Sequence, residues 1–284
     1  TGLKTVKQRY GVETIGALAN PTASLEALFL VQKLMRQLGS NNIDHRLRQQ
    51  DFSDDTLAPL YPGSELPVAA FETLDRALLV GSNIRKEQPL LGLSLRQAVV
   101  KNAAQVSAIN MLDYEFHFPL AHKKLSSAKN MVQSLANVAL VLANKQGVKL
   151  DQNIAVRASE PDAQELAIAH SLLEGDEQSS KAIILGATAL HYFEATNLLA
   201  IADWIARHSG CKLVKLADAN SAGAWIAGCL PHRLAHGVES DSAGLNAAQM
   251  LQQGMSAYLL YDVEPGLDSH HGGRALKSLE EADF

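Results

Sequence analysis

Residues 77–90 read Ala-Leu-Leu-Val-Gly-Ser-Asn-Ile-Arg-Lys-Glu-Gln-Pro-Leu, and this stretch decides the fold. The four apolar residues 77–80 are followed at once by the small residues Gly81-Ser82-Asn83. A short apolar run that ends in a flexible loop is typical of a strand buried on both faces. The stretch therefore predicts a strand–loop–helix unit.

The same pattern recurs along the chain. Two further loops of this kind are Gly186-Ala187-Thr188 and Asp218-Ala219-Asn220-Ser221-Ala222-Gly223. Amphipathic helices are expected between the strands. The predicted strand cores are 14–18, 77–80, 106–109, 182–185, 213–216 and 257–260, and the predicted helices cover about 28–38, 131–142, 162–173 and 194–208. The alternation of strands and helices predicts an α/β fold with parallel sheets and right-handed crossovers.

Local signals refine this expectation. Asn20-Pro21 predicts the start of the first helix, and Ser159-Glu160-Pro161-Asp162 resembles a capping box. Residues 49–67, which contain acidic, Pro and Gly residues, are expected to form a boundary loop, and the stretch after Pro265 is expected to be a loop as well.

Composition excludes several classes of function. The 284 residues suffice for two ordinary domains, and a net charge of −5 without a basic run gives nucleic acid nothing to bind. The two cysteines, Cys211 and Cys229, cannot form a four-cysteine cluster. No apolar run is long enough to span a bilayer. We therefore expect a cytosolic-type compartment and no direct membrane insertion.

The Gly81 loop is the first candidate site, because ligands of open parallel sheets lie at the carboxyl ends of strands. Its glycine, cations and amides suit a phosphate, but the spacing Gly-x-Gly-x-x-Gly is absent, so an ordinary strand-to-helix turn is favoured. Residues 41–46, Asn-Asn-Ile-Asp-His-Arg, either bind a ligand or fix a turn, and their composition favours the turn.

Metal and nucleophile sites have weaker support. Cys229, His232 and His236 have zinc-type side chains at short spacing, but three or four well-aimed ligands are needed, so no metal site is expected. His270-His271 gives a weaker signal still and is expected to lie in a mobile surface segment. Cys211 is expected to be a small core residue. No Gly-x-Ser-x-Gly elbow is present, and no catalytic residue is nominated.

Three segments carry a family resemblance. Residues 38–46, Leu-Gly-Ser-Asn-Asn-Ile-Asp-His-Arg, resemble a segment of the molybdopterin oxidoreductases. Residues 78–90, together with 219–225 and 231–233, resemble the G-type large iron–sulfur subunit of NADH:quinone oxidoreductase, respiratory complex I. The likeness runs from about residue 14 to about residue 262 and points to the C-terminal part of that subunit.

The resemblance implies two Rossmann-like parallel-sheet domains of the formate dehydrogenase/DMSO reductase type, one inserted in the other. The outer domain would comprise residues 1–48 and 221–284, and the inserted domain residues 49–220. The strand-end loops would be a vestigial cofactor site. The residues of that site would be Gly81, Asn83, Arg85, Gly186 and Asn220.

The resemblance also implies a role in respiratory electron transfer from NADH to quinone, as a structural scaffold without its own redox centre. No cofactor is expected in this chain, and the iron–sulfur clusters would lie in the N-terminal part of the full-length subunit. The partners would be other peripheral-arm subunits, at the cytoplasmic face of the bacterial plasma membrane. One alternative is a fragment of an active molybdopterin-dependent oxidoreductase such as a formate dehydrogenase. Another is a nucleotide-binding module.

Overall fold

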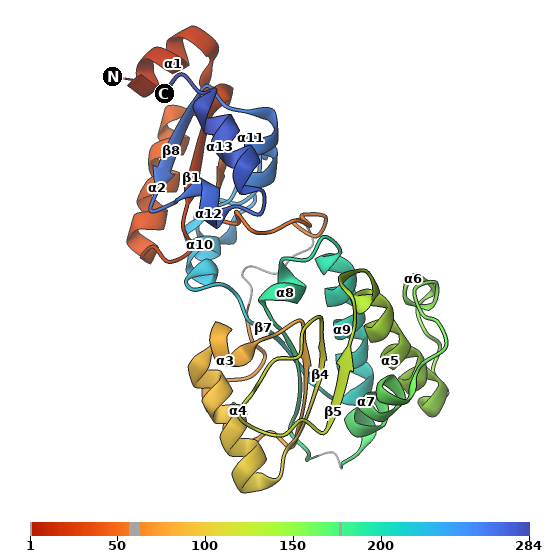
Figure 1. Cartoon of the computed structure of the whole chain (residues 1–284). Coiled ribbons are helices and arrows are strands. Elements are labelled where there is room, and N and C mark those ends of the chain that lie inside the picture. The colour runs from red at the N-terminus through yellow and green to blue at the C-terminus, as the bar shows by residue number, and fades with distance from the viewer. Residues whose placement is uncertain (1, 57–62, 176–177) are drawn as a thin grey trace. The chain divides into compact units, whose positions relative to one another are not determined.

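The computed structural model describes residues 2–56, 63–175 and 178–284. The chain forms two compact units (Figure 1). The outer unit comprises residues 1–62 and 217–284, and the inserted unit residues 63–216. Each unit has its own parallel sheet, so the expected fold class is confirmed. The chain passes from one unit to the other between residues 62 and 63 and again between residues 216 and 217. The sequence predicted these boundaries at 48/49 and 220/221.

The inserted unit is built on a five-stranded parallel sheet of order β5-β4-β3-β6-β7. Counted along the unit, this order is 3-2-1-4-5, the doubly wound arrangement whose switch point lies between its first and fourth strands. Here those strands are β3 and β6. The strands are β3 (Arg76–Val80), β4 (Gln105–Asn110), β5 (His122–Leu125), β6 (Lys181–Leu185) and β7 (Lys212–Lys215).

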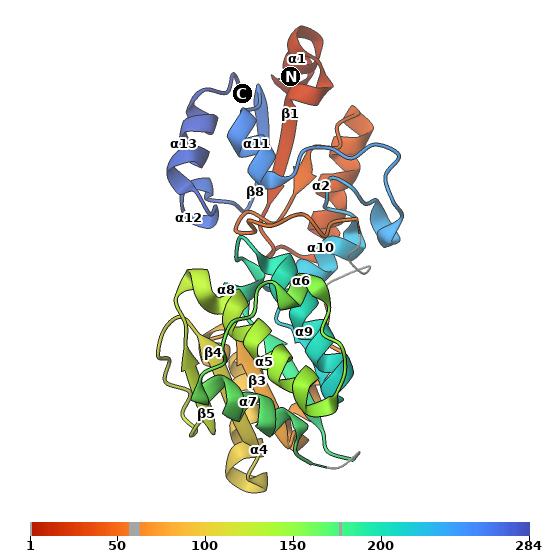
Figure 2. The ribbon, with the colours of Figure 1, turned by 90° about the vertical axis from the view of Figure 1, so that its right-hand side faces the viewer.

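Helices cover both faces of this sheet (Figure 2). Leu78 and Val80 face one core, whereas Ala77 and Leu79 face the other, because successive strand residues point to opposite faces. The first core is covered by α5 (Met131–Gln146), α7 (Ala163–Leu173) and α9 (Ala195–Ser209), and the second by α3 (Ile84–Glu87), α4 (Pro89–Asn102) and the 3-10 segment η2 (Val68–Thr73). The short helices α6 (Gln152–Ala155) and α8 (Ala187–Leu190) complete the unit, with the 3-10 turn η3 (Ala128–Asn130) before α5.

The outer unit is built on a three-stranded parallel sheet of order β2-β1-β8, with its switch point between β1 and β8. Its strands are β1 (Ile15–Ala19), β2 (Ile43–Asp44) and β8 (Ala257–Tyr261). One face is covered by α1 (Gly2–Tyr10), α2 (Leu25–Leu38) and α10 (Ser221–Ala227), and the other by α11 (Ala247–Gln253) and α13 (Gly272–Glu280). The short helix α12 (Pro265–Asp268) precedes α13, and the 3-10 turns are η1 (Val12–Thr14) and η4 (Ala235–Gly237).

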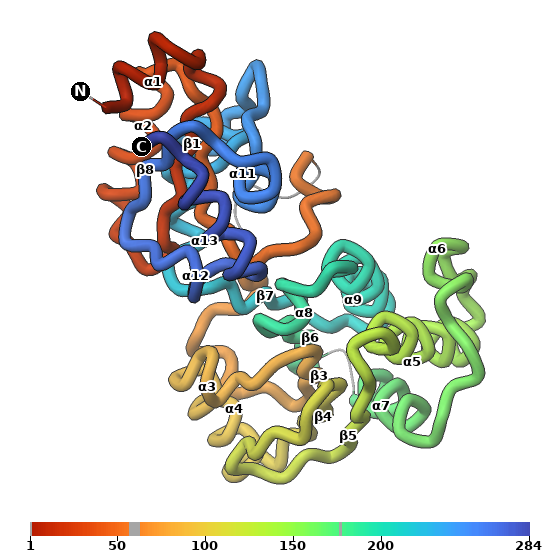
Figure 3. Tube along the Cα trace, turned by 45° about the horizontal axis from the view of Figure 1, so that its top comes forward, coloured from red at the N-terminus to blue at the C-terminus, as the bar shows by residue number. Residues whose placement is uncertain are grey.

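Both ends of the chain lie in the outer unit (Figure 3). A Cβ atom on Gly2 would meet the ring of Phe284 at 2.3 Å, so the ends are in contact. No helix of the described residues combines the length and the hydropathy needed to cross a bilayer.

The predicted helix starts were wrong in two places. The helix expected to start at Asn20-Pro21 is α2, which begins at Leu25 after the N-cap Ser24. Asn20 instead forms a local turn, since its Oδ1 accepts a hydrogen bond from the Thr22 amide at 3.0 Å. At α7 the capping box consists of Asp162 and Glu165, three residues after the Ser159 at which the sequence placed it.

The stretch after Pro265 was wrongly expected to be a loop, because it contains α12 and α13. Helix α13 is short and begins with two glycines, so its apolar periodicity was not recognised in the sequence. It nevertheless packs on the sheet, because Ala275 is fully buried. His270-His271, expected in a mobile surface segment, directly precedes α13, and His271 is its N-cap residue. Residues 41–46 were expected as a turn but contain β2. Of the expected boundary loop, residues 57–62 lie outside the described part of the chain.

Candidate functional site

The switch point of the inserted unit brings two of the predicted site residues together. Gly81 follows β3, and Gly186 follows β6. The carbonyl of Gly81 accepts the amide of Thr188 at 3.0 Å, and the amide of Gly186 donates to the Val80 carbonyl at 3.0 Å. The two strand-end loops are therefore hydrogen-bonded to each other.

Both glycines are required by this close approach. A Cβ atom at Gly81 would lie 2.6 Å from the Ala189 amide nitrogen, and one at Gly186 would lie 2.4 Å from the Cα of Ser82. Gly81 also has a φ of +55°, which L side chains rarely adopt. The glycines thus let the loops close on one another.

The carboxylate of Glu87 fills the space between these loops. Its Oε1 accepts the Asn83 amide at 2.7 Å. Its Oε2 accepts the Ser82 hydroxyl at 3.2 Å and the Ala187 amide at 3.1 Å. These are the kinds of donors that bind phosphate in strand-end loops, and here they are used by an anionic side chain. We call this arrangement the Glu87 cradle.

The role of Glu87 was not anticipated from the sequence. The sequence identified the loop as a possible set of donors, but it gave no role to Glu87. The available signal was an acidic residue in the first turn after a glycine loop, which is common at helix starts and is therefore unspecific.

Among the other predicted site residues, Asn83 contacts the Glu87 carboxylate through its backbone amide, whereas its side chain does not. The Asn83 side-chain oxygen is buried and accepts no hydrogen bond from the described residues. The guanidinium of Arg85 contacts the ring of His117 and lies 3.9 Å from Glu115. Asn220 belongs to the outer unit, where its side chain donates to the Ala23 carbonyl at 2.9 Å and holds the β1–α2 loop.

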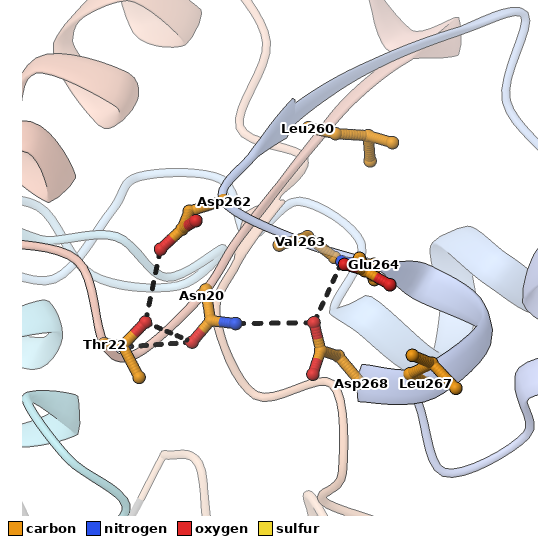
Figure 4. A pocket seen from close by; sticks show the side chains of 8 residues that line it. All are labelled: Asn20, Thr22, Leu260, Asp262, Val263, Glu264, Leu267 and Asp268. Atoms are coloured by element: carbon orange, nitrogen blue, oxygen red, sulfur yellow. Dashed lines mark hydrogen bonds between the residues drawn. The ribbon is translucent and has the colours of Figure 1, made fainter.

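The switch point of the outer unit contains a cavity of about 550 Å³ (Figure 4). It opens at the carboxyl ends of β1 and β8, where the geometry of parallel sheets places ligands. The cavity is lined by Asn20, Thr22, Leu260, Asp262, Val263, Glu264, Leu267 and Asp268.

Three of these lining residues are acidic. Asp268 accepts the Glu264 amide at 2.9 Å and lies 3.4 Å from the Asn20 amide group, and Asp262 accepts the Thr22 hydroxyl at 3.3 Å (Figure 4). Among the ion pairs of the described residues, the only cation on these carboxylates is Arg48, 3.7 Å from Asp268. Such a lining repels a phosphate, so it does not fit the pterin nucleotide that the family fold implies. Asp262 and Glu264 were missed because they lie between the predicted strand core 257–260 and Pro265, where no site was expected, and Asp268 lies in the stretch that was expected to be a loop.

Residues 41–46 stabilise the outer unit from within. Asp44 and His45 are almost fully buried, at 0% and 2% exposure. The His45 Nδ1 lies 3.0 Å from the Cys229 carbonyl and therefore donates to it, so its Nε2 accepts the Ser221 hydroxyl at 2.9 Å. Burial lowers the pKa of His45 to about 4, against the attraction of Asp44, and the ring is neutral at pH 7.

Arg46 joins the boundary loop to this buried cluster. Its guanidinium bonds Asp44 and Asp55 and lies over the rings of Phe52, at 4.8 Å, and Trp225, at 5.6 Å. Burial opposes the charge, but the two carboxylates outweigh it and raise the pKa of Arg46 above its ordinary value. These contacts explain why the chain up to Asp55 stays with the outer unit.

The sequence triple Cys229, His232 and His236 does not assemble. Cys229 is fully buried and burial raises the pKa of its thiol, His232 lies 3.4 Å from Asp55, and His236 is exposed. Across residues 2–56, 63–175 and 178–284, no three His, Cys, Asp or Glu side chains are grouped to hold a metal ion. Cys211, expected as a core residue, is buried.

Comparisons with known proteins agree with the fold. The family model described as Molybdopterin oxidoreductase matches residues 1–283. The NADH-quinone oxidoreductase G subunit of Rickettsia felis (strain ATCC VR-1525 / URRWXCal2) is 33% identical over 107 residues, which are 38% of this chain and 15% of that protein. Its counterpart in Rickettsia conorii (strain ATCC VR-613 / Malish 7) is 32% identical over 107 residues, with the same coverage. The match thus spans well under two thirds of these relatives.

A solved structure supports the architecture. A chain of the formyltransferase/hydrolase complex from Methylorubrum extorquens, crystallised with methylofuran, superposes with a TM-score of 0.58. The superposition covers 93% of this chain and 74% of that one, at 16% sequence identity. At this identity the likeness concerns the fold alone.

Proposed function

Because the chain belongs to the molybdopterin oxidoreductase family, we propose that it is a segment of the G-type large iron–sulfur subunit of an NADH:quinone oxidoreductase. In this proposal it takes part in electron transfer from NADH to quinone as a structural scaffold without its own redox centre. The two Rickettsia relatives support the assignment to that complex.

The observation on which the scaffold role rests is that carboxylates lie at both switch points. In the inserted unit the Glu87 carboxylate accepts the hydrogen bonds that the strand-end loops donate. In the outer unit Asp262, Glu264 and Asp268 line the cavity. A pterin nucleotide carries phosphates, which neither arrangement suits. The protein's own residues thus favour a cofactor-binding frame retained for its shape.

Exposed apolar side chains support a packing role. Helix α4 exposes Leu90, Leu93 and Val100, at 77%, 48% and 64%. Helix α2 exposes Leu30 at 61%. Apolar faces of this kind are common where a protein contacts a partner. The partners in this proposal are other peripheral-arm subunits, on the cytoplasmic side of the bacterial plasma membrane, and the iron–sulfur clusters lie in a part of the subunit outside this chain.

Metal and pterin analysis of the purified full-length subunit tests the scaffold role. We expect iron and sulfide but neither molybdenum nor pterin. Molybdenum at about one atom per chain would overturn the proposal in favour of an active molybdopterin-dependent oxidoreductase.

A thermal-shift screen with guanine and adenine nucleotides tests the nucleotide-binding alternative. We expect no change in the melting temperature of this chain. A ligand that binds the folded state at a hundredfold excess over its Kd would stabilise the chain by about 2.7 kcal/mol, which the screen would detect.

A further inference from the structure

We propose that the Glu87 cradle is a latent oxyanion site, held closed by the chain's own carboxylate, and that it takes inorganic phosphate once that carboxylate is removed. The inference rests on the proposed cofactor-free role and deepens it, because it identifies what occupies the switch point of the inserted unit.

The donors of the cradle converge on one position from two separate loops. The Ser82 hydroxyl and the Asn83 amide come from the loop after β3, and the Ala187 amide comes from the loop after β6. Their distances to the carboxylate oxygens are 3.2, 2.7 and 3.1 Å. A carboxylate and a phosphate both accept hydrogen bonds through several oxygens, so the same donors serve either anion.

The walls of the cradle are held by bonds that do not involve Glu87. The Asn110 side chain accepts the Ser82 amide at 2.8 Å and donates to the Ser82 carbonyl at 3.1 Å. The Gly81 carbonyl accepts the amides of Thr188 and Ala189, at 3.0 and 3.3 Å. Removal of the carboxylate should therefore leave the donors in place and unsatisfied, which is unfavourable for buried groups until another acceptor enters.

Gly186 provides the space for the anion. A Cβ atom at this position would lie 2.6 Å from the Glu87 Oε2. Ser82 is fully buried, whereas Asn83 and Glu87 are half-buried, so Glu87 retains some solvent exposure. Phosphate can thus reach the donors when the side chain at 87 is short.

The experiment compares Glu87→Ala with the wild-type chain and with Glu160→Ala, which removes an exposed carboxylate of the same unit. Melting temperatures are measured in inorganic phosphate and in chloride at matched ionic strength. We expect the wild type and Glu160→Ala to show only the same general stabilisation, without saturation, that phosphate gives folded proteins. Glu87→Ala should melt lower in chloride and recover by a few degrees, in a saturable manner, in phosphate. Titration calorimetry then checks that one phosphate binds per chain.

Each outcome bears on a different claim. If Glu87→Ala folds but its melting temperature does not respond specifically to phosphate, the proposal of a latent site is wrong. The proposed cofactor-free role is unaffected by that result. If the variant fails to fold in chloride, circular dichroism should show refolding in phosphate, and its absence overturns the inference too. Phosphate binding by the wild type, with the same affinity as the variant, would mean that Glu87 does not close the cradle. The metal and pterin analysis of the full-length subunit decides the cofactor-free role independently.

Discussion

Asp44 and Arg46 form a bidentate ion pair in the interior of the outer unit. The Arg46 Nε lies 2.9 Å from the Asp44 Oδ1, and the Nη2 lies 3.0 Å from the Oδ2. The Arg46 and Asp44 side chains are 4% and 0% exposed. Burial alone would raise the pKa of Asp44, but the charge and hydrogen bonds of Arg46 outweigh it and hold that pKa below its ordinary value.

Replacing Arg46 by methionine should destabilise the outer unit strongly. The change leaves Asp44 as a buried charge without its cation, which costs about 3–5 kcal/mol in the free energy of unfolding. Urea unfolding measures this loss. The double variant Asp44→Asn/Arg46→Met should be more stable than Arg46→Met alone, because it removes the stranded charge.

The matched control is Arg207→Met. Arg207 pairs with Asp203 at 3.0 Å, but both side chains are mostly solvated, at 61% and 49% exposure. We expect its removal to cost less than about 1 kcal/mol. A loss at Arg46 no larger than the loss at Arg207 would contradict the importance of the buried pair.

His45 should make stability depend on pH. Its folded pKa is about 4 and its ordinary value is 6.5, so the unfolded chain binds the proton more readily. The stabilisation is complete above pH 6.5 and is lost as the pH falls toward 4, by on the order of 3 kcal/mol. The lowered pKa of His232 acts in the same direction. The free energy of unfolding, measured between pH 4 and pH 6.5, gives the slope of stability against pH.

The variant His45→Gln should flatten that slope, although it also lowers stability at neutral pH. His236→Asn is the control, because His236 is exposed and has a φ of +61°, which asparagine tolerates. We expect the control to keep the wild-type slope. An unchanged slope in His45→Gln would assign the pH dependence to other groups.

Asp162 should stabilise α7 as its N-cap. Its Oδ1 accepts the amides of Gln164 and Glu165 at 3.0 and 2.9 Å. Replacing it by alanine removes the acceptor of both hydrogen bonds and should cost about 1 kcal/mol in the free energy of unfolding, measured by chemical denaturation. Asp162→Asn keeps a capping oxygen and should cost clearly less. Equal losses for the two variants would show that the charge, which also pairs with Lys124, matters more than the cap.

Periodicity predicted the strand cores well, because buried parallel strands are short apolar runs. All six expected strands are present, and the helices predicted at about 28–38, 131–142 and 194–208 are present as α2, α5 and α9. Two strands, β2 and β5, were not predicted, because their sequences lack a short apolar run. β2 has only two residues, and β5 reads His-Lys-Lys-Leu, with half-exposed polar side chains. Neither resembles a buried strand.

The candidate site was only partly predictable for a different reason. The sequence identified Gly81 and Gly186 as strand-end glycines, and topology then places their strands side by side. Nothing in the pattern indicated that Glu87 would also accept the Ala187 amide, since that bond depends on the pairing of β3 with β6. The acidic cavity likewise joins Asn20 and Asp268, residues that are far apart in sequence.

Replacing Gly186 by alanine tests how closely the two strand-end loops approach. Its φ of −92° suits any residue, so the cost comes from packing alone. The new Cβ would lie 2.4 Å from the backbone Cα of Ser82, and we expect a loss of about 1–3 kcal/mol in urea unfolding. Gly273→Ala is the control: its Cβ would meet nothing within 4 Å, and in helix α13 it should stabilise by up to about 1 kcal/mol. If Gly186→Ala is as harmless as Gly273→Ala, the loops are farther apart than the Glu87 cradle requires.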